Sequence, residues 1–227
     1  MTDAVKAPPR VLALVAHPDD EVLGVGGTLA RHAAQGQNVY IAFLADGVGA
    51  RSGDKAAAER RAAASRQAAK ILGAHPPRFL GFEDQRLDAV ELLDIVRKVE
   101  ALIEEIQPVI VYTHHHGDLN LDHVICQRAV MTACRPLPGS PVRRIYAMEV
   151  ASSTEWAPGE VFNPTRFVDV SSMMDIKRRA LEAYAEEMRP FPHARSFDAL
   201  DALARWRGSS VGLTAAEAFA VLREIES

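Results

Sequence analysis

The most informative stretch of this chain is Val11-Leu12-Ala13-Leu14-Val15-Ala16-His17-Pro18-Asp19-Asp20-Glu21. Its first six residues are aliphatic, which is typical of a strand buried on both faces of a parallel sheet. The strand leads directly into a histidine and three acids, and acids are rarely buried without a partner. In open α/β sheets, ligands and catalytic groups gather at the carboxyl ends of strands. The stretch therefore predicts a first strand that ends at a polar site.

Strand-like and helix-like segments alternate through the first two-thirds of the chain. We expect strands at 11–16, 39–44, 78–82, 109–112, 145–150 and 167–170, and helices at 21–35, 54–72, 89–106 and 121–133. Apolar strands that alternate with helices indicate a parallel sheet covered on both faces. The last part, 171–226, is expected to be mostly helical. We predict an α/β fold with a Rossmann-like, mostly parallel sheet flanked by helices and a helical C-terminal part.

Length and composition fit one globular domain. The chain has 227 residues, 48% of them hydrophobic, and a net charge of −4. We find no repeat or linker, so we expect residues 1–227 to form a single domain. Mild acidity without a basic stripe argues against nucleic acid as a partner. The sequence leaves the oligomeric state open, a homo-oligomer included.

Two features indicate a cytoplasmic protein without a membrane span. No apolar run reaches the roughly 18 residues of a membrane helix, and the first ten residues lack the apolar core of a signal peptide. Cys126 and Cys134 lie eight residues apart in one predicted helix. That spacing is about 12 Å along the helix axis, too far for a disulfide. We expect both thiols to be reduced.

The glycines at positions 24, 26 and 27 invite comparison with a dinucleotide-binding loop. They lie inside the first predicted helix and follow the acidic motif, whereas a pyrophosphate needs glycines in the strand-to-helix turn. We interpret them as residues that allow the helix to pack closely on the sheet.

The polar residues suit a divalent metal. His17 and Asp20 offer an imidazole and a carboxylate, and Asp19 between them stays free to act as a base. A second polar run, 114–123 (HHHGDLNLDH), follows the strand-like segment 109–112. A third ligand from this run would complete a two-histidine, one-carboxylate site with an open position, the catalytic type for zinc. The alternative is a polar loop in which Asp20 caps the following helix.

Not all of the consecutive histidines 114–116 can face one ion. Successive residues at a strand end point to opposite sides, so we expect at most one or two of the three to line the pocket and the others to be solvated.

These motifs resemble those of a known family. Residues 16–21 (AHPDDE) resemble the signature of the LmbE/PIG-L-like de-N-acetylases, zinc enzymes that remove acetyl groups from N-acetylglucosaminyl compounds. The resemblance covers most of the chain, because the segments 46–51, 72–73, 81–84 and 118–123 fall in the expected order. The segments 152–156, 192–196 and 207–208 resemble a sugar-modifying branch of that family.

The resemblance implies that His17, Asp20 and His123 bind Zn²⁺ and that Asp19 is the general base. The chemistry agrees, since a zinc site with an open position lowers the pKa of bound water to about 7. Asp19 adjoins a ligand and can take the proton of that water and return it to the leaving amine. For Asp122 two roles stay open: it orients an imidazole from behind or caps a helix.

The chain departs from one common form of the family's second motif, His-x-Asp-His, in which the first histidine helps to stabilise the tetrahedral oxyanion. Asn120 stands at that position, and its amide can donate a hydrogen bond but supplies no positive charge. His193, between Pro190 and Pro192, is our candidate to replace it. The alternative for His193 is a structural role, capping a helix or contacting Arg195.

Substrate contacts are expected from Arg51, Arg61 and Asp118. An arginine fork of donors suits sugar hydroxyls or a phosphate. For Arg61, which lies in a charged helix, a solvated helix face is the competing interpretation.

Together these features predict a zinc-dependent amidohydrolase that deacetylates a small N-acetylated amino sugar. We expect a carrier-linked, N-acetylglucosamine-like substrate and a role in glycan or glycoconjugate biosynthesis. A thiol-conjugate amidase or a natural-product deacetylase would keep the metal and change the substrate. A metal-binding module without activity is the non-enzymatic alternative, and Asp19 argues against it, since mere binding needs no unligated carboxylate there.

Overall fold

One seven-stranded sheet organises the residues that the structure describes. The computed structural model describes residues 8–45, 55–159 and 161–226, and the strand order is β3-β2-β1-β4-β5-β7-β6. The strands are β1 (Arg10–Val15), β2 (Asn38–Ala45), β3 (Arg78–Phe82), β4 (Ile110–His114), β5 (Arg144–Met148), β6 (Arg166–Asp169) and β7 (Ala216–Glu224). Neighbouring strands are parallel except where β7 pairs with β5 and β6. The mostly parallel α/β sheet is confirmed.

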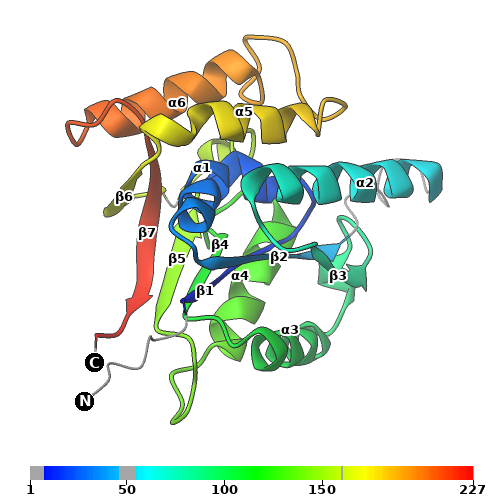
Figure 1. Ribbon diagram of the computed structural model, residues 1–227. Coiled ribbons are helices and arrows are strands. Elements are labelled where there is room, and N and C mark those ends of the chain that lie inside the picture. Colours follow the sequence, from blue (N-terminus) through cyan, green and yellow to red (C-terminus); the bar gives the residue numbers. More distant parts are fainter. Residues whose placement is uncertain (1–7, 46–54, 160, 227) are drawn as a thin grey trace.

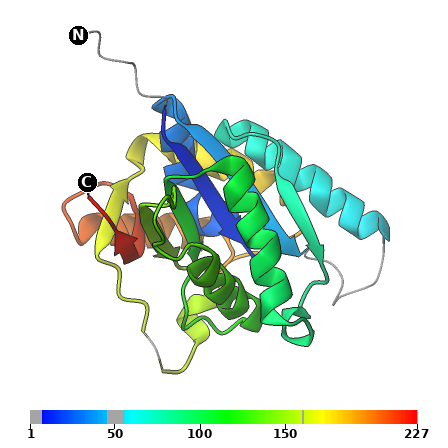
Figure 2. The same ribbon diagram turned by 90° about the horizontal axis from the view of Figure 1, so that it is seen from below.

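Helices cover both faces of the sheet. The α-helices are α1 (Asp20–Ala34), α2 (Lys55–Leu72), α3 (Leu92–Ile106), α4 (Leu121–Ala133), α5 (Met174–Glu182) and α6 (Phe197–Ser209). Helices α1, α2 and α5 lie on one face, α3 and α4 lie on the other, and α6 packs near β7 (Figures 1 and 2). Short 3-10 turns are η1 (Leu87–Ala89), η2 (Thr154–Trp156) and η3 (Ser171–Met173).

Strand β1 shows why its sequence is continuously apolar. Val11, Ala13 and Val15 belong to the core under α1 and α2, whereas Leu12 and Leu14 belong to the core under α3 and α4. All five side chains are inaccessible to solvent. A strand with a helical layer on each face has no polar side, so it cannot alternate.

The C-terminal part differs from the expectation. Residues 171–226 were expected to be mostly helical, but 216–224 form β7, which is inserted between β5 and β6 and pairs with both. The segment AEAFAVLRE is rich in good helix formers, which explains the wrong prediction. Pairing on two sides overrides that local preference.

The glycines of α1 allow a close approach, as the sequence indicated. A Cβ atom on Gly24 would lie 2.5 Å from Sδ of Met148, and one on Gly27 would lie 2.9 Å from Cβ of Val170. Helix α1 is thereby held against β5 and the end of β6.

Two further expectations can be checked in the described part of the chain. Cys126 and Cys134 are buried free thiols. No described helix has both the length and the apolar character needed to cross a bilayer.

Candidate active site

The candidate site lies at the carboxyl ends of β1 and β4, which are neighbours in the sheet. From β1 the chain moves to β2 on one side, whereas β4 lies on the other side, so the strand order changes direction here. Ligands of open α/β sheets bind at such a point. His17 and Asp20 follow β1, Asp118 and His123 follow β4, and all four residues are buried.

Three side chains meet there as a possible metal-binding group. His17, Asp20 and His123 each offer one ligand atom, and these atoms lie within 4.8 Å of one another. Oδ2 of Asp20 is 3.4 Å from Nδ1 of His17 and 3.3 Å from Nε2 of His123. The same oxygen accepts a hydrogen bond from the backbone N–H of His17 at 2.9 Å. The structure thus brings together the three residues that the resemblance selected as ligands.

The polar atoms of this group fit a divalent cation. Burial lowers the pKa of His123, but the carboxylates of Asp20 and Asp118 outweigh burial and raise it to about 9. Oδ1 of Asp20 and Nε2 of His123 are buried, and neither atom has a hydrogen-bond partner among the described residues. Leaving such atoms without a partner is costly, and a bound cation would satisfy both. Two imidazoles and one carboxylate form a donor set that zinc accepts.

Asp118 contacts Nδ1 of His123, the ring nitrogen opposite the one that lies near Asp20. Its Oδ1 is 3.2 Å from Nδ1 of His123 and accepts the backbone N–H of Asn120 at 2.9 Å. The hydroxyls of Ser153 and Thr154 donate to the two carboxylate oxygens. Burial raises the pKa of Asp118, but its hydrogen bonds outweigh burial and lower the pKa to about 2. Because both oxygens are used inside the protein, we interpret Asp118 as a residue that orients His123 rather than as the substrate contact expected from the sequence.

Asn120 is the N-cap of α4. Its side-chain oxygen accepts the backbone N–H of Asp122 at 2.9 Å. Asn120 therefore caps the helix, which was one of the two roles considered for Asp122. The carboxylate of Asp122 contacts His17 instead.

Two buried acids converge on Nε2 of His17. Oδ2 of Asp122 and Oδ1 of Asp84 each lie 3.0 Å from it. Asp122 is itself fixed by the backbone N–H groups of Gln85, at 2.8 Å, and Leu87, at 3.1 Å. A carboxylate behind a metal-binding imidazole sets its tautomer and its orientation. This geometry favours the imidazole-orienting role for Asp122.

The side chain of Asp19 contacts two arginines. Its Oδ2 accepts a hydrogen bond from Nη1 of Arg195 at 2.8 Å and lies 3.5 Å from Nη2 of Arg61. Burial raises the pKa of the Asp19 carboxyl above its ordinary value, although both guanidinium groups oppose the shift. A carboxyl group whose pKa is moved towards neutrality suits proton transfer.

Arg61 is buried, which corrects the interpretation that it lies on a solvated helix face. Its Nε donates to the carbonyl of Pro18 at 3.0 Å, and its Nη1 forms an ion pair with Glu187. Arg61 therefore supports the loop that carries Asp19. The other arginine expected to bind substrate, Arg51, lies outside the described residues.

His193 lies between α5 and α6. Its Nδ1 accepts the backbone N–H of Arg195 at 3.0 Å, and its ring meets Trp156 edge-on at 6.1 Å. The contact with Arg195, which belongs to the structural alternative for His193, is present. Because Nδ1 is the acceptor, the ring proton sits on Nε2, which can donate to another group.

Two of the three consecutive histidines are buried, and they are adjacent in sequence, so burial does not follow a simple strand alternation. His114 and His115 are buried, whereas His116 is exposed. Nε2 of His114 accepts the backbone N–H of Ala16 at 2.8 Å, and its ring stacks on His123 at 3.9 Å. Burial and the nearby His123 lower the pKa of His114 to about 3, so His114 is a neutral ring that stacks on His123.

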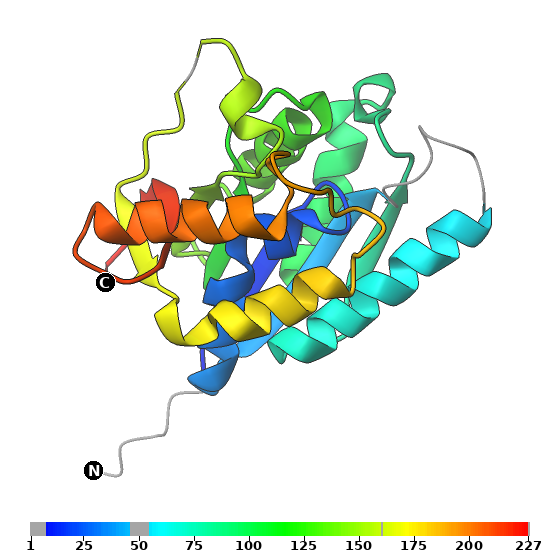
Figure 3. The same cartoon turned by 90° about the horizontal axis from the view of Figure 1, so that it is seen from above.

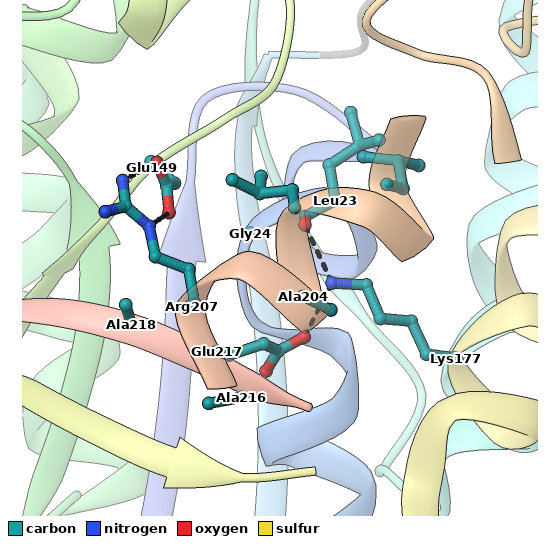
Figure 4. A pocket seen from close by; sticks show the side chains of 11 residues that line it. Leu23, Gly24, Glu149, Lys177, Ala204, Arg207, Ala216, Glu217 and Ala218 are labelled. Atoms are coloured by element: carbon teal, nitrogen blue, oxygen red, sulfur yellow. Dashed lines mark hydrogen bonds and ion pairs between the residues drawn. The ribbon is translucent and has the colours of Figure 1, made fainter. Parts of the chain in front are cut away.

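A second buried cluster of charges lies farther along α1. Lys177 of α5 donates to Oε1 of Glu217 at 2.6 Å and to the carbonyl of Leu23 at 3.0 Å (Figure 4). The cavity that these side chains line has a volume of about 20 Å³, which is room for little more than one water molecule. Arg207, which also lines this cavity, forms a bidentate ion pair with Glu149.

Two residues in contact with the site were not selected from the sequence. Asp84 comes shortly after β3, in the same position as His17 after β1, and that position was the available signal. Arg195 comes from an irregular loop, where no periodicity shows which side chain turns inward.

Comparison with known proteins identifies the family. The PIG-L family, described as GlcNAc-PI de-N-acetylase, matches residues 12–134, from β1 to the end of α4. The uncharacterized deacetylase YaiS of Escherichia coli (strain K12) is 38% identical over 133 residues, which cover 56% of this chain and 69% of that protein. A probable N-acetyl-alpha-D-glucosaminyl L-malate deacetylase 2 of Bacillus cereus is 29% identical over 209 residues, covering 87% and 93%.

The fold is shared along almost the whole chain. The crystal structure of the conserved protein TT1542 from Thermus thermophilus superimposes with a TM-score of 0.79 at 26% identity, over 96% of this chain and 97% of the other. The family match spans more than half of the 227 residues and contains His17, Asp20 and His123. This chain belongs to the PIG-L family of GlcNAc-PI de-N-acetylases.

Proposed function

We propose that this protein is a zinc-dependent hydrolase that removes the acetyl group from an N-acetylated amino sugar. The observation that carries the proposal is the meeting of His17, Asp20 and His123 beside an acid, Asp19, that belongs to no part of the ligand group. Family membership and the similarity to a probable N-acetylglucosaminyl malate deacetylase support the substrate class.

The reaction divides between ligands and base. His17, Asp20 and His123 would hold the metal. When bound, zinc would polarise the amide carbonyl and lower the pKa of water beside it. Asp19 accepts the proton of the attacking water and later delivers it to the departing amine. The water oxygen bonds to the acetyl carbon, the C–N bond breaks, and acetate and the free amino sugar leave.

The surrounding residues orient these groups. Arg61 and Arg195 hold the carboxylate of Asp19, and Asp122 orients His17. We assign the oxyanion contact to Nε2–H of His193. Asn120, whose oxygen caps α4, keeps its amide N–H group as the second candidate for that contact.

We further propose that the amino sugar is linked to a carrier and belongs to glycan or glycoconjugate assembly. Contacts to a part of the substrate that does not react can orient its amide, and the guanidinium fork of Arg51 suits a hydroxyl or phosphate of that part. The reduced, buried thiols of Cys126 and Cys134 support a cytoplasmic location.

Acetate release tests the proposal. The zinc-loaded protein is assayed for kcat/KM on free N-acetylglucosamine and on its nucleotide-, lipid- and cysteine-linked forms. We expect a linked form to be the better substrate. Equal values would favour a general deacetylase, and preference for the cysteine-linked form would favour a thiol-conjugate amidase. Zinc binding without acetate release from any substrate would contradict the proposal and leave a metal-binding module.

A further inference from the structure

Glu21 is a fully buried acid that the proposed reaction does not use. Its Oε2 accepts the backbone N–H of Asp19 at 3.0 Å, and its Oε1 accepts the hydroxyl of Tyr184 at 2.7 Å. Acids are almost never fully buried unless their oxygens are paired. The role of Glu21 can therefore be inferred from its two partners, the backbone of Asp19 and the hydroxyl of Tyr184.

The first of these hydrogen bonds joins Glu21 to a residue whose backbone conformation is unusual. Asp19 has φ 115° and ψ −31°, a region that residues with a side chain rarely adopt. Such a conformation persists only where the surroundings fix it, and it occurs preferentially at functional sites. The bond from the Asp19 N–H to Glu21 is one of the contacts that fix it.

The carboxylate of Asp19 does not make the contact that its position in the chain predicts. Asp19 occupies the N-cap position of α1, where an aspartate ordinarily turns its side chain back onto the amides of the first turn. Here the side chain makes no capping hydrogen bond. Its carboxylate contacts Arg195 and Arg61 instead. Asp19 therefore does not cap α1, although its residue type and position predict that it would. Its carboxylate can serve another function.

One segment of the chain is connected both to the backbone and to the carboxylate of Asp19. The connection between α5 and α6 begins near Tyr184 and ends near Arg195, and it passes beside the start of α1 (Figure 3). Tyr184 reaches the backbone of Asp19 through Glu21, and Arg195 contacts its carboxylate directly at 2.8 Å.

We propose that Glu21 and Tyr184 form a positioning pair that keeps Asp19 in its positive-φ conformation, so that its carboxylate faces the reacting amide instead of capping α1. The inference rests on the proposed role of Asp19 as the base. Neither member of the pair touches the reacting atoms.

The first test removes only the hydroxyl, with Tyr184→Phe. We expect kcat for acetate release to fall between about 10- and 100-fold, as for a displaced catalytic group, with KM changed less than about twofold and zinc content unchanged. Tyr112→Phe is the matched control, because Tyr112 is equally buried and its hydroxyl is 2.9 Å from Nε2 of His32, in a cluster outside the site. An equal loss of kcat in both variants would overturn the proposal.

A double-mutant cycle separates positioning from general destabilisation. In an Asp19→Asn background, Tyr184→Phe should cause no further loss of kcat, because the group that it positions is already disabled. Glu21→Gln keeps the size of the side chain and removes one acceptor, so it should resemble Tyr184→Phe. Losses that multiply in the double variant would contradict an action through Asp19.

Crystal structures of the zinc-loaded wild type and Tyr184→Phe give a readout without turnover. We expect Asp19 to leave positive φ in the variant and its carboxylate to cap α1. An unchanged φ would refute the positioning pair. Absence of acetate release by the wild type would instead refute the proposed function, and the structural comparison would still decide the inference.

Discussion

Helix α1 contacts two buried clusters of charged side chains, one near its middle and one at its first turn. Near the middle, Glu217 accepts the backbone N–H groups of Gly27, at 2.8 Å, and Thr28, at 2.7 Å, and the ammonium group of Lys177. Lys177 also donates to the carbonyl of Leu23. The carboxylate and the ammonium group are therefore both supplied with partners by the protein itself.

The cluster at the first turn is built differently. Three potential ligand atoms from His17, Asp20 and His123 crowd within 4.8 Å, and Asp20 Oδ1 and His123 Nε2 have no hydrogen-bond partner among the described residues. Native proteins pair nearly all buried polar atoms, so an unpaired one needs an explanation. We call the group around Lys177 and Glu217 the paired cluster and the group of His17, Asp20 and His123 the unpaired cluster. Of the two, only the unpaired cluster keeps, among the described residues, buried polar atoms that a ligand could satisfy.

The largest effect is expected where the unpaired cluster loses a ligand. His123→Ala should abolish both zinc retention and acetate release, because one of the three proposed protein ligands is gone. Metal content measured after dialysis, together with the acetate assay, checks this. His75→Ala, at an exposed site beside Tyr40, is the control and should keep both properties. Full zinc occupancy in His123→Ala would remove the ligand assignment.

The paired cluster should respond in stability and not in metal binding. Lys177→Met leaves the buried carboxylate of Glu217 without its cation, which costs about 3–5 kcal/mol of the free energy of unfolding. Denaturant unfolding of the metal-free protein measures this loss, and zinc content should stay at the wild-type level. Arg78→Met is the matched control, because the exposed pair of Arg78 with Glu105 is worth at most about 1 kcal/mol.

If Lys177→Met lost zinc while keeping its stability, the division between the two clusters would be wrong. Adding Glu217→Gln to Lys177→Met should recover part of the stability, since the unpaired charge is then removed as well.

The two clusters also differ in how far the sequence predicts them. A polar site at the ends of β1 and β4 could be predicted, because His17 and the run 114–123 follow apolar segments, and parallel strands bring their carboxyl ends to one edge. Within that run, it was the family resemblance that selected His123. The pair of Lys177 and Glu217 could not be predicted, because it depends on β7. The segment 216–224 has the composition of a helix, and only pairing with β5 and β6 makes it a strand.

Side chains that support the site were the hardest to predict. Arg61 lies in a charged, alanine-rich helix, where nothing local shows that one arginine of several is covered by Glu187. Asp118 and Asp122 differ by four residues, yet one contacts His123 and the other His17. Their direction depends on the loop between β4 and α4, whose backbone the sequence does not determine locally.

The smallest of these effects concerns His193, which lies in the connection between α5 and α6, two positions before Arg195. His193 donates through Nε2 in our proposal, while its Nδ1 holds the N–H of Arg195. His193→Ala should lower kcat by an amount equal to about 3–4 kcal/mol in the transition state, the usual contribution of an oxyanion donor, with a much smaller change in KM. His193→Asn separates the two nitrogens, because its oxygen can replace Nδ1 as acceptor while the Nε2 donor is lost. We expect both variants to lose kcat equally in the acetate assay. Recovery of kcat in His193→Asn would show that only the contact with Arg195 matters, and the oxyanion role would pass to Asn120.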